Sequence, residues 1–213
     1  MSAPADRARQ GFHLGRFLRN AGIIAAAGFM LGWGYKEAVH PNLFPKNFGT
    51  VVEGAIYRSG ELTPAATEKV VREHGIRTII DFGAHEFGSP EEARAQRTAE
   101  ALGVERVRLP LYGDGTGDPN MYVKALGIMT DPARRPVLIH CAAGAERTGC
   151  AVAMYRHIYE GVPLEETLEE ARRHRHDPER TPQVGQVLRE WTDDVARSLE
   201  TGEPIPYEGG TKK

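Results

Sequence analysis

The chain has 213 residues, with 27 Lys and Arg against 29 Asp and Glu, and a formal net charge of −2. This length favours one domain of roughly 150 residues with appendages. The near-neutral charge argues against a nucleic-acid partner. Two cysteines exclude both a disulfide-rich scaffold and a cysteine-rich zinc site.

The first 35 residues differ in character from the rest. Four arginines within residues 1–19 precede an uncharged run over 21–35. The run is shorter than the roughly 20 residues of a typical spanning helix, but Trp33 and Tyr35 suit a membrane interface. We predict a basic N-terminus and membrane anchor over 1–35, with a cleaved signal or a soluble docked helix as alternatives. The basic flank then places the remaining chain outside the cytoplasm. A cytoplasmic location is the alternative.

Residues 36–48 carry two prolines and no hydrophobic period, so we interpret them as a linker. The domain is expected over 49–198 and a disordered tail over 199–213. The pattern predicts a hairpin over 51–57, strands over 78–82, 105–109 and 136–139, and helices over 64–74, 90–103, 120–129, 150–158, 164–174 and 184–195. This alternation indicates an α/β fold: a single three-layer domain with a mainly parallel central sheet flanked by helices, plus an N-terminal hydrophobic helix.

The most informative stretch is residues 140–149 (HCAAGAERTG), between an apolar strand and a helix. Backbone amides and the helix dipole attract an anion at such a junction. A cysteine at such a junction, like Cys141, is typical of a nucleophile. Arg147, after five intervening residues, can hold two phosphate oxygens through its planar fork. Thr148 can donate to the sulfur, and Gly144 permits the torsions of a tight cradle.

This block resembles the signature loop of the cysteine-dependent protein tyrosine and dual-specificity phosphatases, His-Cys-x5-Arg-Ser/Thr. Together with residues 55–60 and 75–81, it is similar to the compact atypical dual-specificity phosphatases, especially a group found in bacteria, plants and fungi. The resemblance covers about residues 48–198, although only the loop is specific. A rhodanese, a thiol-based arsenate reductase and a structural cysteine are the competing interpretations. Rhodanese loops usually lack the central glycine and the Arg-Thr-Gly ending, and the small arsenate reductases carry their loop near the N-terminus. A structural cysteine would leave the glycines and the strand context unexplained.

The resemblance implies hydrolysis of phosphomonoesters in two steps, without a metal or another cofactor. Cys141 would attack phosphorus and water would hydrolyse the resulting thiophosphoryl-enzyme. Thr148 would stabilise the thiolate, and His140 would anchor the loop. The phosphate oxygens would be bound along the loop, by Ala142, Ala143, Gly144, Ala145, Glu146 and Arg147.

The general acid is open among three carboxylates. Family members carry an Asp in the loop before the helix that precedes the signature strand, which favours Asp114. Asp118 is an alternative acid, or only the cap of that helix. Glu146 lies inside the signature loop, where some relatives carry a proton donor.

Several further residues can have either a functional role or an ordinary structural one. Gln183 resembles a glutamine that positions water in some relatives, but it equally suits an ordinary helix surface. Arg58 and Asp81 fall in family-like segments and can simply brace the sheet. The basic cluster over 172–176 is either an anion-binding patch or a solvated helix end. Cys150 is more typical of a packing residue than of a redox partner.

The expected partner is a phosphorylated protein, with phosphotyrosine favoured and dual specificity allowed. A phosphoinositide or inositol polyphosphate phosphatase is the first alternative. Polyanion-cleaving relatives often carry lysines in the loop, where this chain has alanines and Glu146. A phospho-binding pseudophosphatase is the second alternative.

Overall fold

The computed structural model describes residues 20, 22–36 and 40–209. It divides into two units, Met1–Leu43 and Phe44–Lys213. In the first unit, residues 22–34 form a helix and α2 spans His40–Leu43. Within the described ranges, no helix is both long and apolar enough to cross a membrane. The predicted anchor over 21–35 is therefore unsupported. The basic residues 1–19 lie outside the described part.

The second unit is built on a five-stranded sheet of order β1-β2-β5-β3-β4. The strands are β1 (Gly49–Val52), β2 (Ile56–Ser59), β3 (Thr78–Asp81), β4 (Glu105–Arg108) and β5 (Val137–His140). β1 runs antiparallel to β2, and the remaining neighbours are parallel. The prediction of a mainly parallel α/β sheet is confirmed. Because β5 is central, its carboxyl end opens between β2 and β3.

Helices follow the strands in the predicted order. They are α3 (Pro64–His74), α4 (Pro90–Ala101), α5 (Asn120–Thr130), α6 (Glu146–Glu160), α7 (Leu164–Arg173) and α8 (Gln183–Thr201). The predicted caps begin two of them: Thr63 accepts from the Ala66 amide and Ser89 from the Glu92 amide, both at 3.2 Å. Each satisfies an amide that the first helical turn leaves unpaired.

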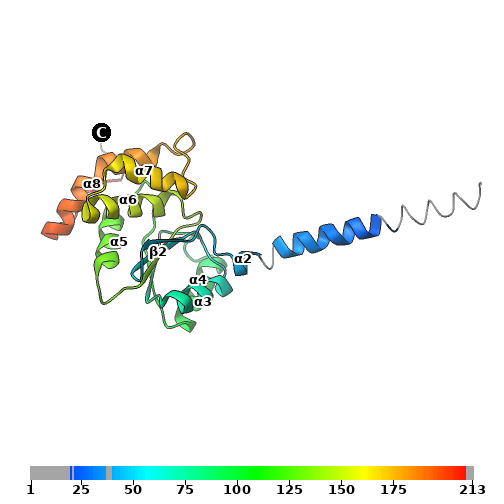
Figure 1. Ribbon diagram of the computed structural model, residues 1–213. Coiled ribbons are helices and arrows are strands. Elements are labelled where there is room, and N and C mark those ends of the chain that lie inside the picture. Colours follow the sequence, from blue (N-terminus) through cyan, green and yellow to red (C-terminus); the bar gives the residue numbers. More distant parts are fainter. Residues whose placement is uncertain (1–19, 21, 37–39, 210–213) are drawn as a thin grey trace, which may run out of the picture. The chain divides into compact units, whose positions relative to one another are not determined.

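The two faces of the sheet carry different helices (Figure 1). Successive strand residues point to opposite faces. Ile80 and Ile139 therefore join the larger core with α5, α6 and α8, while Ile79 and Leu138 pack in a smaller cluster with α3. The result is three layers with the signature loop at the carboxyl edge.

Two predicted boundaries need correction. α6 begins at Glu146 and not at Cys150, so the end of the signature loop forms its first turn.

The expected tail over 199–213 is ordered as far as it is described. α8 continues to Thr201, and the Asn120 side chain then donates to the Ile205 carbonyl at 2.9 Å and accepts from its amide at 2.8 Å. One amide group satisfies both backbone groups of Ile205, which is buried. Residues 210–213 lie outside the described part.

Candidate active site

The signature loop begins where β5 ends, and its thiol is enclosed. Cys141 is buried, and the Gly144 amide donates to its sulfur at 3.2 Å. The Gly144 amide thus points toward the sulfur, as loop amides do toward a bound anion. The predicted pairing of this thiol with a small-residue loop is present in the structure.

The backbone carbonyls of this loop accept hydrogen bonds from side chains and backbone amides of other segments. Lys46 Nζ and the Glu61 amide donate to the Ala142 carbonyl at 2.8 and 3.2 Å. Arg58 Nη2 donates to the Gly144 carbonyl at 2.8 Å. With these carbonyls held away from the thiol, the loop amides are left to face an anion, as in other backbone nests.

Asn47 reinforces this arrangement. Its Nδ2 lies 3.2 and 2.9 Å from the Ala143 and Gly144 carbonyls, and 2.9 Å from the His174 carbonyl at the end of α7. The segment interpreted as a linker over 36–48 thus ends by contacting the loop. Sequence reasoning missed both Lys46 and Asn47, because their partners lie 96 to 127 residues further along the chain.

Position 144 requires glycine for two reasons, its backbone torsion and the close packing around it. Its φ is +72°, and a Cβ there would lie 2.5 Å from both the Gly60 nitrogen and the Ser59 carbonyl oxygen. Any side chain would press on the backbone that leaves β2. The expectation that this position needs glycine is therefore supported twice.

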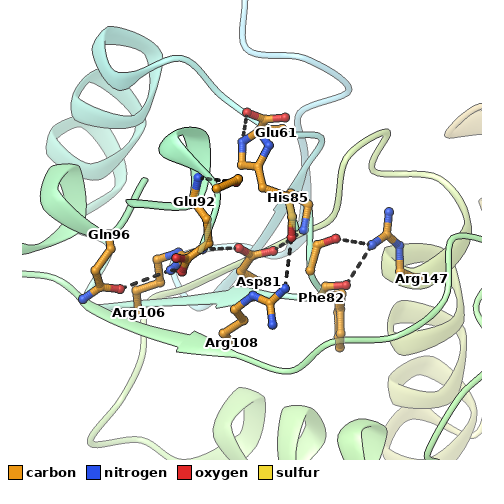
Figure 2. Close-up of polar contacts among 12 residues, drawn as sticks. Glu61, Asp81, Phe82, His85, Glu92, Gln96, Arg106, Arg108 and Arg147 are labelled. Atoms are coloured by element: carbon orange, nitrogen blue, oxygen red, sulfur yellow. Dashed lines mark hydrogen bonds and ion pairs between the residues drawn. The ribbon is translucent and has the colours of Figure 1, made fainter. Parts of the chain in front are cut away.

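Arg147 lies in the first turn of α6 and is mostly buried. Its Nη1 donates to the Phe82 and Gly83 carbonyls at 2.9 and 2.6 Å, just beyond β3 (Figure 2). These two bonds orient the guanidinium at the carboxyl edge of the sheet, near Cys141. The expected bond from Thr148 to the sulfur is not formed: its hydroxyl is buried and has no hydrogen-bond partner among the described residues.

Arg58 places a second buried cation under the loop. Its side chain is fully enclosed. Burial lowers its pKa to about 10, although the nearby Glu170 and Cys141 oppose this by favouring the charged form. Because it holds the Gly144 carbonyl and acts electrostatically on Cys141, Arg58 belongs to the site. The sequence analysis considered only that Arg58 braces the sheet, and so it missed this contact with the signature loop.

Asp114 lies on a loop fixed against α6. Its Oδ1 accepts from the amide and hydroxyl of Thr116 at 3.0 and 2.7 Å. The Tyr122 hydroxyl donates to the Gly115 carbonyl at 2.6 Å, and a Cβ on Gly115 would lie 3.0 Å from the Cys150 sulfur. This loop therefore packs over the helix that begins at the signature loop.

The other two acid candidates differ in setting. Asp118 Oδ1 accepts from the Asn120 amide and Nδ2 at 2.9 and 2.7 Å, so it braces the start of α5 and the Ile205 contact. Glu146 is the first residue of α6 and is partly exposed. Its charge acts on His176, whose pKa is lowered chiefly by burial.

The remaining predicted residues lie away from the thiol or beside its loop. His140 is buried, and burial is the main cause of its lowered pKa. Asp81 pairs with Arg106 at 2.5 Å on the α4 side of the sheet (Figure 2). Gln183 starts α8. The basic cluster over 172–176 comprises the last two residues of α7 and the three that follow it, and it reaches the loop because the His174 carbonyl accepts from Asn47.

Cys150 is completely buried inside α6, and burial raises the pKa of its thiol to about 12. Such a thiol stays protonated at neutral pH, which supports the interpretation as a packing residue.

Comparison with known proteins identifies the family to which this chain is similar. Residues 39–187 match the family described as "DSP-PTPase phosphatase fused to NAD+ Kinase". An inositol diphosphatase of Arabidopsis thaliana is 31% identical over 121 residues, which cover 54% of this chain and 55% of that protein. The dual specificity protein phosphatase TpbA of Pseudomonas aeruginosa is 34% identical over 118 residues, covering 55% of this chain and 50% of that protein. The chain thus spans about half the length of these relatives.

Solved structures agree on the fold. The core catalytic domain of a PP-IP phosphatase of Saccharomyces cerevisiae, crystallised with citrate, superposes with a TM-score of 0.62 at 25% identity, covering 74% of this chain and 93% of that one. The Pseudomonas aeruginosa TpbA structure gives a TM-score of 0.60 at 21% identity, covering 73% and 92%.

Proposed function

Because the chain belongs to the DSP-PTPase phosphatase family described as fused to NAD+ kinase, we propose that it hydrolyses phosphotyrosine in protein substrates, with phosphoserine and phosphothreonine as secondary substrates. Membership of the cysteine-dependent phosphatases, expected from the signature loop, is confirmed. The observation that carries the proposal is the loop itself. The Gly144 amide points at the Cys141 sulfur, and Lys46 and Arg58 tie carbonyls outward.

The mechanism assigns each step to a residue of this chain. The Cys141 thiolate attacks phosphorus in line, the bond from phosphorus to the leaving oxygen breaks, and that oxygen takes a proton from the general acid. Water then attacks the thiophosphoryl group, giving a proton to the now deprotonated acid, and the bond from phosphorus to sulfur breaks to release phosphate and the thiolate. Arg147 and the loop amides stabilise the equatorial oxygens in both steps. Thr148, whose buried hydroxyl has no partner within the described part of the chain, donates to the departing sulfur.

We assign the general acid to Asp114. Its loop is packed against α6 by Tyr122 and Gly115, whereas Asp118 is committed to Asn120. Asp114→Asn should lower turnover by roughly 10²–10⁴ for an alkyl or phenyl leaving group and much less for an activated aryl phosphate. Asp118→Asn is the matched control and should mainly cost stability.

Steady-state kinetics with leaving groups of graded pKa separates these assignments. A large loss in Glu146→Gln that depends on the leaving group, with Asp114→Asn close to wild type, would move the acid to the signature loop.

The side chains of the loop favour a phosphoprotein substrate over a polyanion. Ala142, Ala143 and Ala145 add no positive charge, and Glu146 adds a negative one at the start of α6. A monoester dianion is matched by Arg147 and the amides, while further phosphates would face that carboxylate. A named dual specificity protein phosphatase among the relatives supports the same substrate class.

One observation favours a second candidate, an inositol polyphosphate or diphosphate substrate. Lys46 lies on the rim of the loop with its ammonium 2.8 Å from the Ala142 carbonyl, and Asn47 joins the loop to the basic cluster over 172–176. These cations come from outside the signature motif. Relatives named as inositol diphosphatases support this candidate.

A paired assay decides between the two. We expect kcat/KM for a phosphotyrosine peptide to exceed that for inositol polyphosphates and diphosphates by at least about tenfold, the effect of ~1.4 kcal/mol of differential binding. Lys46→Ala removes the bond to the Ala142 carbonyl and should lower kcat/KM for the peptide by no more than about tenfold, the effect of one hydrogen bond. A reversed preference that Lys46→Ala abolishes would establish the second candidate. Cys141→Ser is the negative control, and wild-type protein without turnover on either class would indicate a phospho-binding pseudophosphatase.

A further inference from the structure

Tyr122 is a buried polar side chain that takes no part in either chemical step. It lies in the first turn of α5 and is almost completely enclosed. Burial raises the pKa of its hydroxyl well above the usual range, and the neighbouring Cys150 thiol adds to the effect. The hydroxyl therefore stays protonated near neutral pH and is available as a hydrogen-bond donor.

This hydroxyl holds the loop that carries Asp114. It donates to the Gly115 carbonyl at 2.6 Å, and Gly115 is itself buried. Within the part of the chain that the structure describes, the other hydrogen bonds of residues 112–117 are made inside the turn. The bond from Tyr122 is therefore the hydrogen bond that joins this turn to the rest of the domain.

Close packing restricts the same turn. Gly115 has a φ of +93°, and a Cβ there would lie 3.0 Å from the Cys150 sulfur and 3.4 Å from the Tyr122 oxygen. The glycine thus lies directly against α5 and α6, with no room for a side chain. Cys150 is in the second turn of α6, and Arg147 is in the first. The turn that carries the acid is therefore packed against the helix that carries the arginine.

Tyr122 also contacts the segment that orients Arg147. Its ring lies 6.0 Å, centroid to centroid, from the ring of Phe82, which is completely buried. The Phe82 carbonyl accepts from Arg147 Nη1 at 2.9 Å (Figure 2). One side chain therefore contacts the residue after Asp114 through its hydroxyl, and a residue that binds the arginine through its ring.

The relative placement of the acid and the arginine matters for the reaction. The acid must reach the leaving oxygen while the arginine holds the equatorial oxygens, and a misplacement of about 1 Å can cost roughly 10²-fold in rate. We propose that Tyr122 is a positioning residue, whose hydroxyl holds the Asp114 carboxyl at the leaving oxygen. This inference rests on the proposed phosphatase function and on Asp114 as its general acid.

The first test compares two leaving groups in Tyr122→Phe, which keeps the ring against Phe82. We expect kcat/KM for phenyl phosphate to fall roughly 10- to 100-fold. For para-nitrophenyl phosphate, kcat/KM should fall by less than about threefold, because this leaving group needs little protonation.

Tyr57→Phe is the matched control. The Tyr57 hydroxyl also bonds to the backbone, since it accepts from the Gly54 amide at 3.1 Å. Its ring belongs to the smaller core cluster, on the opposite face of the sheet from α6. This variant should therefore hydrolyse both substrates like the wild type.

A double variant separates positioning from stability. In Asp114→Asn there is no carboxyl to place, so the addition of Tyr122→Phe should lower kcat/KM for phenyl phosphate by less than about a further threefold. If Tyr122→Phe acted only by destabilising the fold, its loss would multiply with that of Asp114→Asn.

Hydrogen exchange measures the hold on the turn without turnover. The amides of Tyr112 and Gly115 are bonded inside the turn. We expect residues 112–117 to exchange at least about tenfold faster in Tyr122→Phe than in the wild type, and at the wild-type rate in Tyr57→Phe.

Gly115→Ala keeps the proposal testable if Tyr122→Phe fails to fold. The new Cβ would meet the Cys150 sulfur and push the turn away from α6, so kcat/KM for phenyl phosphate should fall. Cys150→Ala in the same chain removes that sulfur and should recover at least about threefold of the loss.

The outcomes that contradict the proposal are distinct. Equal losses on the two substrates in Tyr122→Phe, losses that multiply in the double variant, or unchanged exchange over 112–117 would each overturn the positioning role. Failure of the proposed function would look different, because the wild-type protein would then hydrolyse neither substrate. Hydrogen exchange would still report whether Tyr122 holds the turn.

Discussion

Gly144→Ala tests the central feature of the site, the close approach of the signature loop to the chain leaving β2. The new Cβ would lie 2.5 Å from the Gly60 nitrogen and the Ser59 carbonyl oxygen, both of them backbone atoms that cannot swing aside. The left-handed torsion at φ +72° costs a non-glycine residue roughly 1–2 kcal/mol, and overpacking adds about 1–3 kcal/mol. We expect a loss of about 2–5 kcal/mol in the free energy of unfolding, measured by urea denaturation.

The same substitution should lower activity in the fraction that remains folded. Relief of the clash moves the Gly144 amide away from the Cys141 sulfur, from which it lies 3.2 Å. A hydrogen bond to a charged group contributes about 1.5–3 kcal/mol, so kcat/KM should fall roughly 10- to 150-fold. Gly127→Ala is the control: this exposed helical glycine has no atom near a built Cβ, and alanine should stabilise α5 by about 0.5–1 kcal/mol. Wild-type stability and turnover in Gly144→Ala would refute the packing argument.

Three further predictions rest on burial. Arg106→Leu leaves the Asp81 carboxylate buried without its 2.5 Å partner, and urea denaturation should show a loss of about 3–5 kcal/mol; a loss below about 1 kcal/mol would contradict the pairing. Burial raises the pKa of Cys150 to about 12, so peptide mass spectrometry should find its alkylation by iodoacetamide at least about 100-fold slower in folded than in urea-unfolded protein. Burial lowers the pKa values of His140 and His174, so the unfolded chain binds more protons just below its own pKa near 6.5. Stability to urea should therefore decline as pH falls below about 6.5, and a rise toward pH 5.5 would be incompatible with neutral buried histidines.

The chemistry of the signature loop could be predicted from sequence because its parts are local. Cys141, Gly144 and Arg147 lie within seven residues, and a strand followed by a helix brings their groups together whatever the rest of the chain does. The caps at Thr63 and Ser89 were predictable for the same reason, since each side chain accepts from an amide three residues on. The α/β class followed from the alternation of strand and helix patterns.

What holds the loop in shape depended on the tertiary structure. Lys46, Asn47 and Arg58 contact it across 86 to 97 residues of chain, and none of them carries a local pattern that marks it as part of a site. The ordered course of the chain through Ile205 was missed for a similar reason, because its partner Asn120 lies 85 residues earlier.

The prediction of Cys141 as the nucleophile and Arg147 as the phosphate ligand, with Gly144 between them, rests on residue type and short spacing within one stretch of sequence. Which side chains bind the loop carbonyls, and which carboxylate loop packs against α6, depends on contacts between distant segments. These arrangements follow from strand order and register, which bring distant residues together and which no local stretch of sequence specifies.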